Sequence, residues 1–242
     1  ASLEELIDQT IPAEIRLKEP LHLPQAMTQA QYLAHFHQLA SLNKPFKNYI
    51  GLGYYSVPME PVIQRNIFEN PAWYTSYTPY QAEISQGRLE ALMNFQTMVA
   101  SLTGLPIANA SLLDEGTSAA EAMLMLFHAR SREQKKAGVS KFFVSENVLP
   151  QTLDVLKTRA EPLGIELVEG DEFAFSPQPD YFGMILQYPT ATGAVEDYRQ
   201  VVEQAHQAGV KVVVAADILS LALLIPPGEW GADVAVGSTQ RF

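Results

Sequence analysis

Apolar residues recur with two different periods along the chain, and the period changes near residue 104. Before that point, apolar positions lie three and four residues apart, which is the period of a helix with one buried face. After it, short continuous apolar runs alternate with segments of helical period. Continuous apolar runs are typical of parallel strands that helices cover on both faces. The pattern therefore predicts an N-terminal helical arm followed by an α/β unit with a mostly parallel sheet.

Two helices near the N-terminus are predicted from their first residues. Ser2 with Glu5, and Thr28 with Gln31, have the spacing of a capping box. A third helix is expected after Pro58, with three apolar residues turned inward, namely Val62, Ile63 and Ile67. A fourth, long helix is expected to open at Ser85 and to end at Gly104 as its C-cap. We therefore assign residues 1–84 to a helical arm with an aromatic loop and residues 85–242 to the α/β domain.

The second part of the chain predicts strands and helices in alternation. The expected strands are Leu105–Ala108, Phe142–Ser145, Ile165–Val168, Met184–Tyr188, Val210–Asp217 and Val234–Gly237. The expected helices between them are Thr117–Arg130, Leu149–Leu163 and Glu196–Ala208. Because the sequence stops directly after the last apolar strand, we expect the domain to be incomplete at its C-terminal end.

Composition excludes several classes of function. The chain has 242 residues and a formal net charge of −11, which disfavours nucleic acid and anionic membrane as partners because both need a basic face. The absence of cysteine excludes disulfides, thiolate-bound metal and cysteine nucleophiles. The five histidines have no partner at ligand spacing, so no metal site is expected. No apolar run approaches the roughly 20 residues of a membrane span. A location in the cytosol or inside an organelle fits this composition, and the predicted location is the cytoplasm of a bacterium or, in a eukaryote, the mitochondrial matrix.

A segment at the start of a predicted helix offers two interpretations. Gly116, Thr117 and Ser118 could supply backbone N–H groups, hydroxyls and a positive helix end, which together bind an anion such as phosphate. Alternatively, Thr117 or Ser118 simply caps the helix, with Glu121 as the acid of a capping box. Asp114 and Glu115 immediately before the glycine favour capping, since carboxylates repel a phosphate.

A carboxylate is predicted at the end of a wholly apolar strand. Asp217 follows Val212-Val213-Val214-Ala215-Ala216, at the edge where open α/β sheets bind ligands. A buried carboxylate in this position needs a partner, such as a protonated ring nitrogen or a backbone cap. An anion cradle, a strand-end aspartate and a downstream lysine are the components of a pyridoxal-phosphate (PLP) site. Where that lysine is sought, however, the chain has Arg241, whose guanidinium cannot form a Schiff base.

The aromatic stretch Trp73–Tyr80, which precedes the long helix, has neither the period of a helix nor that of a strand. Three of its tyrosines, with Gln81 and Glu83, offer stacking faces and polar groups. We expect an ordered loop here, which serves either as part of a functional site or as a core or subunit contact. Tyr77, Tyr80 and Glu83 are the candidate site residues.

Several short stretches of the sequence, taken together, resemble the glycine decarboxylase P-protein family, the PLP-dependent glycine dehydrogenases of the glycine cleavage system. The resemblance extends over the whole chain and is closest to the N-terminal part of the long single-chain form. Its strongest carriers are Tyr77-Thr-Pro-Tyr-Gln-Ala-Glu, Asp114-Glu-Gly-Thr-Ser-Ala-Ala-Glu-Ala, Pro226-Pro-Gly-Glu-Trp-Gly-Ala-Asp and Gly237-Ser-Thr-Gln-Arg-Phe. The family consists of two related halves of the type I PLP-dependent transferase fold, of which only the C-terminal half carries the Schiff-base lysine.

The resemblance implies a function for the whole protein and a supporting role for this chain. The whole protein would decarboxylate glycine and pass the aminomethyl group to the lipoyl arm of H-protein, as a homodimer. PLP would be bound by the other half, leaving Gly116, Thr117, Ser118 and Asp217 as remnants of a cofactor site. Tyr77, Tyr80 and Glu83 would line the glycine pocket or the lipoyl channel. The chain alone is expected to be inactive.

Two other interpretations remain open from the sequence. In the first, this half is purely structural and provides only dimer interface and H-protein docking. In the second, the chain is a self-sufficient PLP enzyme such as an aminotransferase. The second requires a lysine at the carboxyl edge of the sheet, whereas Lys211 is expected at the start of its strand.

Overall fold

The computed structural model describes residues 2–19, 21–75 and 81–241 of the chain. The chain divides into two compact units, Ala1–Lys47 and Asn48–Phe242, and each is described here by itself. The division predicted from the sequence, into a helical arm at residues 1–84 and an α/β domain at residues 85–242, stays a prediction.

The first unit contains two helices, α1 (Leu3–Thr10) and α2 (Gln29–Ala40). Both predicted capping boxes are confirmed. The hydroxyl of Ser2 accepts from the backbone N–H of Glu5 at 3.2 Å, and the Glu5 carboxylate accepts from the Ser2 N–H at 2.8 Å. Thr28 and Gln31 make the same reciprocal pair. These helices are therefore defined locally, by hydrogen bonds at their first turns.

The second unit is built on a sheet of five strands that all run parallel. The strands are β1 (Lys141–Ser145), β2 (Glu166–Gly170), β3 (Tyr181–Tyr188), β4 (Lys211–Ala216) and β5 (Val234–Val236). Their order across the sheet is β2-β1-β3-β4-β5, so β1, β3 and β4 each have a strand on both sides. Five of the six predicted strands are confirmed within a few residues, and the α/β class with a parallel sheet is confirmed.

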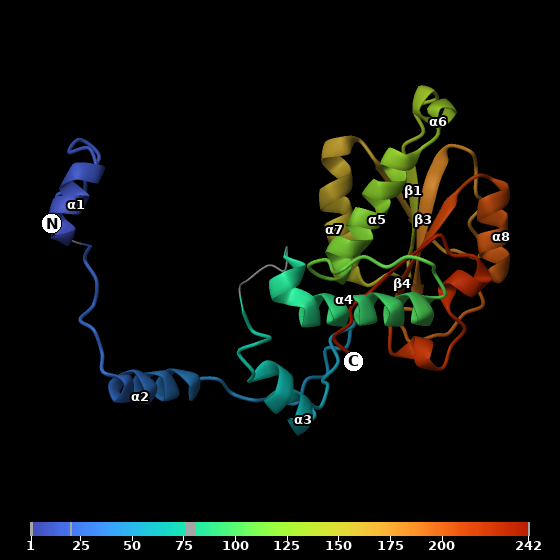
Figure 1. The fold of residues 1–242 in the computed structure, drawn as a ribbon. Coiled ribbons are helices and arrows are strands. Elements are labelled where there is room, and N and C mark those ends of the chain that lie inside the picture. Colours follow the sequence, from blue (N-terminus) through green and yellow to red (C-terminus); the bar gives the residue numbers. More distant parts are fainter. Residues whose placement is uncertain (1, 20, 76–80, 242) are drawn as a thin grey trace. The chain divides into compact units, whose positions relative to one another are not determined.

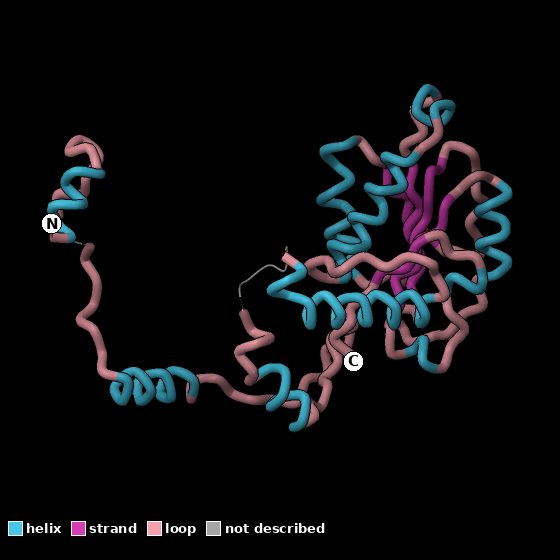
Figure 2. Tube along the Cα trace, in the orientation of Figure 1, coloured by secondary structure: helices cyan, strands magenta, loops and turns pink. Residues whose placement is uncertain are grey.

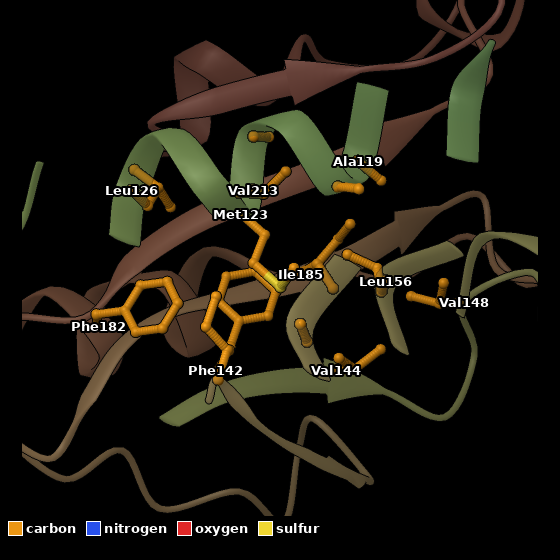
Figure 3. Close-up of a cluster of buried hydrophobic side chains, with 14 of the residues drawn as sticks. Ala119, Met123, Leu126, Phe142, Val144, Val148, Leu156, Phe182, Ile185 and Val213 are labelled. Carbon is orange, nitrogen blue, oxygen red and sulfur yellow. The ribbon is translucent and has the colours of Figure 1, made fainter. Parts of the chain in front are cut away.

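Helices cover both faces of the sheet (Figures 1 and 2). α5 (Glu115–Ala129) and α7 (Pro150–Ala160) lie on one face, and α8 (Arg199–Gln207) lies on the other. Side chains alternate along the central strands accordingly: Val213 packs with α5, and its neighbour Val212 packs with α8. Figure 3 shows the α5 side, where Met123 and Phe142 are fully buried. Burial on both faces explains why these strands are continuous apolar runs.

The long helix α4 (Ala82–Thr103) begins three residues before the predicted Ser85 and ends as predicted. Gly104 caps it in the left-handed conformation, with φ of 68°. Its backbone also packs closely against the turn η4 (Pro227–Trp230), since a Cβ on Gly228 would lie 2.2 Å from the Gly104 carbonyl oxygen. This contact fixes the end of α4 beside the sheet.

The helix predicted after Pro58 is short and irregular. It consists of α3 (Pro61–Ile63) and a π-helical turn, η1 (Gln64–Phe68). The prediction that its apolar residues turn inward is wrong for this unit, because Val62 is 62% exposed and Ile67 is 41% exposed. The remaining short elements are α6 (Arg132–Lys136), η2 (Glu161–Leu163) and η3 (Ser220–Ala222).

The predicted strand Leu105–Ala108 is wrong. The segment is irregular and pairs with none of the described strands; its carbonyl at Ala108 instead accepts from the side chain of Gln96 at 3.0 Å. An apolar run becomes a strand only where a neighbouring backbone completes its hydrogen bonds, and a sequence pattern does not reveal that neighbour.

Candidate functional site

Asp217 stands at the carboxyl edge of the sheet, directly after β4. Its backbone N–H donates to the Tyr188 carbonyl at 2.9 Å, continuing the β3–β4 ladder by one residue. Its carboxylate oxygen Oδ1 accepts from the N–H of Leu219 at 3.0 Å, and its carbonyl accepts from the N–H of Ser220. These bonds hold the turn after β4 and orient the second carboxylate oxygen away from it.

That second oxygen has a cationic partner from the segment that follows β5. Nη1 of Arg241 donates to Oδ2 of Asp217 at 3.0 Å, and the two side chains are 26% and 28% exposed. The guanidinium also lies over the ring of Tyr55, 4.8 Å from its centroid. The structure gives Asp217 a charged partner, which is Arg241, the residue at the position where the sequence analysis sought a lysine.

Tyr55 belongs to a segment that sequence reasoning did not associate with the site. The neighbouring Gln240 side chain donates to the Tyr55 carbonyl at 3.3 Å, and Gln151 of α7 donates to the Leu52 carbonyl at 2.6 Å. Gly53 has a φ of +85°, and a Cβ there would meet the Leu149 side chain at 3.0 Å. The glycine thus permits both the turn and its close approach to α7.

The start of α5 is capped by an acid. Asp114 is the N-cap: its Oδ1 accepts from the N–H of Thr117 at 2.7 Å, and its carbonyl accepts from both the N–H and the hydroxyl of Ser118. The Thr117 N–H bond lowers the pKa of Asp114. The prediction of Thr117 or Ser118 as the cap is wrong, since the helix begins two residues earlier. Glu121 pairs with Arg159 of α7 rather than with the cap.

Gly116, Thr117 and Ser118, the residues predicted to bind an anion, already make contacts within the protein. Gly116 is buried against α7, where a Cβ would meet the Val155 side chain at 3.2 Å. The amide of Thr117 and both donors of Ser118 bond to Asp114. With the carboxylates of Asp114 and Glu115 in the same turn, this helix end is not suited to a phosphate group. The residues present therefore do not fit PLP bound in the usual manner.

Glu115 extends from the first turn of α5 toward Asp217. Burial raises the pKa of its carboxyl, and the charges of Asp217 and Asp114 add to that effect, while a hydrogen bond from Gln187 opposes it. Its Oε1 is buried without a hydrogen-bond partner among the described residues. Nothing in the sequence pattern distinguished this glutamate from an ordinary first-turn acid.

A cavity of about 240 Å³ joins these groups. It lies at the carboxyl ends of β3 and β4, the edge where open α/β sheets bind ligands. Its polar lining includes Tyr55, Glu115, Gln187, Thr190, Asp217 and Arg241. The structure thus brings Asp217 together with Arg241 and Glu115. Gly116, Thr117 and Ser118 are absent from this lining.

A buried network supports one wall of the cavity. Glu172 is 1% exposed and accepts from the hydroxyl of Ser145 at 2.6 Å, the amide of Asn147 at 3.2 Å and the hydroxyl of Tyr198 at 3.2 Å. Burial and the Glu172 charge raise the pKa of Tyr198. The Asn147 carbonyl in turn accepts from the N–H of Ala191 at 2.9 Å, which holds the loop after β3. A lone glutamate in a polar segment gave no sign of this role.

The aromatic candidates can be placed only in part. Tyr77 and Tyr80 lie outside the described residues. Glu83 lies in the first turn of α4 and is exposed. Elsewhere, no group of three or more histidine or acidic residues in the described ranges could hold a metal ion. In the same ranges no helix is long and apolar enough to cross a membrane.

The sheet and its edge define a class of α/β domain with a small polar cavity at the carboxyl ends of its central strands. The family model of the glycine cleavage system P-protein matches residues 1–242, and the chain belongs to that family.

Curated relatives also match this chain over its whole length. The chain is 61% identical over 241 residues to a glycine dehydrogenase (decarboxylating) of Bacteroides thetaiotaomicron and 56% identical to that of a Synechocystis strain. In both comparisons the match covers 100% of this chain, but only 25% and 24% of the relative. The chain therefore spans about a quarter of the length of the curated relatives it matches.

A solved structure has the same fold. The chain superimposes with a TM-score of 0.83 and 38% identity on a crystal structure of glycine decarboxylase (P-protein) of the glycine cleavage system in inhibitor-bound form. The match covers 98% of this chain and 54% of the other.

Proposed function

We propose that the protein containing this chain is a PLP-dependent glycine dehydrogenase that decarboxylates glycine and passes the aminomethyl group to the lipoyl arm of H-protein. The support is the family match over all 242 residues, together with relatives of about 60% identity that carry the name glycine dehydrogenase (decarboxylating). A cytoplasmic, homodimeric enzyme is part of this proposal.

The chain's own role in that enzyme is to support a site whose cofactor is held elsewhere. The observation that carries this role is the Arg241–Asp217 ion pair. A guanidinium stays protonated at physiological pH and cannot act as the amine of a Schiff base. Asp217 already has the Arg241 guanidinium as its counter-ion, and the Thr117 N–H and both donors of Ser118 are bonded to Asp114. The Schiff-base lysine and the bound PLP then belong to the rest of the protein.

The segment before α4 is the proposed contribution of this chain to the active site. Tyr77, Tyr80 and Glu83 would line the glycine pocket or the channel for the lipoyl arm. Glu83 supports this as an exposed acid in the first turn of a rigid helix that a glycine C-cap fixes. Substituting Tyr77→Phe and Tyr80→Phe in the complete enzyme should lower turnover; unchanged turnover in both variants would favour a purely structural half.

The decisive experiment is glycine–bicarbonate exchange, measured for this chain alone and for the complete protein that contains it. We expect no exchange from the chain alone, because it offers no anchored cofactor, and exchange from the complete protein. Exchange by the isolated chain with added PLP would contradict the supporting role. Absence of exchange from a folded, PLP-loaded complete protein would contradict the enzymatic assignment itself.

A further inference from the structure

The cavity at the carboxyl ends of β3 and β4 contains two buried hydrogen-bond acceptors that have no partner among the described residues. One is Oε1 of Glu115, and the other is Oε1 of Gln187; neither has a partner in the described part of the chain. Gln187 is 4% exposed, so water from the bulk does not reach its side chain freely. Leaving a buried acceptor unpaired destabilises the folded protein, because the acceptor loses its hydrogen bond to water without gaining another. Two such atoms in one cavity indicate a missing donor.

Gln187 is directed to this cavity by the pleat of β3. Ile185, two residues earlier, is fully buried in the cluster that contains α5. Because alternate residues of a strand share a face, the Gln187 side chain also extends toward α5. There it meets Glu115 in the first turn of that helix, and its amide donates to the glutamate. Its amide oxygen remains available to a ligand.

The charge of the cavity is also unbalanced. Its lining contains two carboxylates, Glu115 and Asp217, and one cation, Arg241. Arg241 is paired with Asp217, so no cationic side chain of the lining is left for Glu115. The helix end at Glu115 favours its negative charge but gives no hydrogen to Oε1. The expected occupant therefore carries both a positive charge and N–H donors.

Size and lining restrict the occupant further. A volume of about 240 Å³ is below the range of about 300–1,000 Å³ for pockets that take drug-sized ligands. Leu149 and Pro189 give the cavity an apolar part beside its acceptors. Two carboxylates alone do not make a metal site, and no group of three potential ligands exists among residues 2–19, 21–75 and 81–241. A compact organic cation fits these limits better than a divalent metal.

We propose that this cavity binds a small primary ammonium compound. Its N–H groups would donate to Oε1 of Glu115 and Oε1 of Gln187, and its short carbon chain would lie against Leu149 and Pro189. The proposal concerns binding by this chain and does not depend on the enzymatic function proposed above.

Saturation-transfer NMR with methylammonium as the probe tests the proposal on the complete protein that contains this chain. We expect saturable transfer to the methyl group in the wild type. Glu115→Gln removes the charge, and Gln187→Met removes the second acceptor at similar volume. Each should weaken methylammonium binding at least tenfold. Glu121→Gln is the matched control, because it removes an acid from the same helix that pairs with Arg159, and it should bind as the wild type does.

Competition by tetramethylammonium distinguishes recognition of N–H donors from recognition of charge alone. Tetramethylammonium has the same charge without N–H groups and should not compete with methylammonium. If the wild type gives no saturable transfer, the proposal is wrong. It is equally wrong if both cavity variants bind methylammonium as the wild type does, since binding would then occur elsewhere in the protein. Using two independent variants keeps the test decisive when one of them fails to fold.

Discussion

Nη1 of Arg241 lies 3.0 Å from Oδ2 of Asp217, so the carboxylate that directly follows β4 has a guanidinium as its counter-ion. The pair joins the end of β4 to the segment after β5. It also places the guanidinium over Tyr55 at 4.8 Å, which brings the 51–55 turn to the same edge. One interaction thus connects three distant parts of the chain.

Arg241→Met should destabilise the α/β unit by about 1.5–3 kcal/mol, the scale of a hydrogen bond to a charged group. The methionine keeps the apolar stem but leaves the Asp217 carboxylate without its cation. Asp217→Asn in the same background should recover part of this loss, because the unpaired charge is removed. Free energies of unfolding from denaturant titration of the two single variants and the double variant give the coupling energy.

Arg199→Met is the control for this pair. Arg199 binds Asp197 two residues away, and the side chains are 68% and 60% exposed. An exposed pair contributes only about 0–1 kcal/mol. If Arg241→Met and Arg199→Met cost the same, the partly buried position of Arg241 has no special value.

Glu115→Gln should make the protein more stable at pH 7. Burial, together with the charges of Asp217 and Asp114, raises the pKa of Glu115 above its unfolded value. The stability contributed by the protonated carboxyl is therefore complete at low pH and is lost as the pH rises through the raised pKa. The glutamine cannot ionise, so it avoids that loss. Thermal unfolding midpoints measured from pH 3 to pH 8, without added amines, should diverge in favour of the variant as the pH rises; a constant difference would contradict the assignment.

Asp233 has the opposite pH dependence. Burial opposes its ionisation, but three donors outweigh burial and lower its pKa: Nζ of Lys211 at 2.8 Å, the N–H of Val212 at 2.8 Å and Nε2 of His206 at 2.9 Å. A lowered pKa gives stability that is present above the unfolded value of about 3.9 and is lost as the pH falls through the folded pKa.

Asp233→Asn should accordingly cost about 1.5–3 kcal/mol at pH 7, where the wild-type carboxylate accepts charged hydrogen bonds. The cost should decrease as the pH falls below the unfolded value toward the lowered pKa of the folded state, where the wild-type carboxylate becomes protonated. Asp180→Asn is the control, because Asp180 pairs with Lys141 at an exposed position. Unfolding free energies of both variants at pH 7 and pH 3 test the difference; an equal cost at both pH values would show that the carboxylate charge at Asp233 is not responsible.

The sequence predicted most of the sheet because its signals are local. The run Val212–Ala216 needs only its neighbours to be identified as a strand buried on both faces, and capping boxes at Ser2 and Thr28 are complete within four residues. Asp217 was found for the same reason, since a carboxylate after such a run is conspicuous in the sequence.

The parts that were missed depend on contacts between distant residues. Tyr55 meets Arg241, and Glu172 meets Tyr198, only after the chain has folded. The strand predicted at Leu105–Ala108 was wrong because the described chain places no hydrogen-bonding neighbour beside it. At the start of α5, two adjacent hydroxyl residues gave a stronger capping signal than Asp114, yet the helix begins where the acid can reach the N–H of Thr117.

Gly237→Ala tests whether the close packing of Gly237 against β4 positions Arg241 beside Asp217. Gly237 follows β5, and a Cβ there would lie 2.1 Å from the carbonyl oxygen of Ala216. The backbone must shift to relieve this contact, which costs about 1–3 kcal/mol. The shift acts on the segment that carries Arg241, so the Arg241–Asp217 bond should weaken as well. In the Gly237→Ala background, Arg241→Met should therefore lower the free energy of unfolding by less than it does in the wild type.

Gly87→Ala is the matched control. A Cβ at this position in α4 would meet nothing within 4 Å, so the substitution should stabilise the helix by about 0.5–1 kcal/mol. If the cost of Arg241→Met is the same in the Gly237→Ala and wild-type backgrounds, Gly237 does not position Arg241.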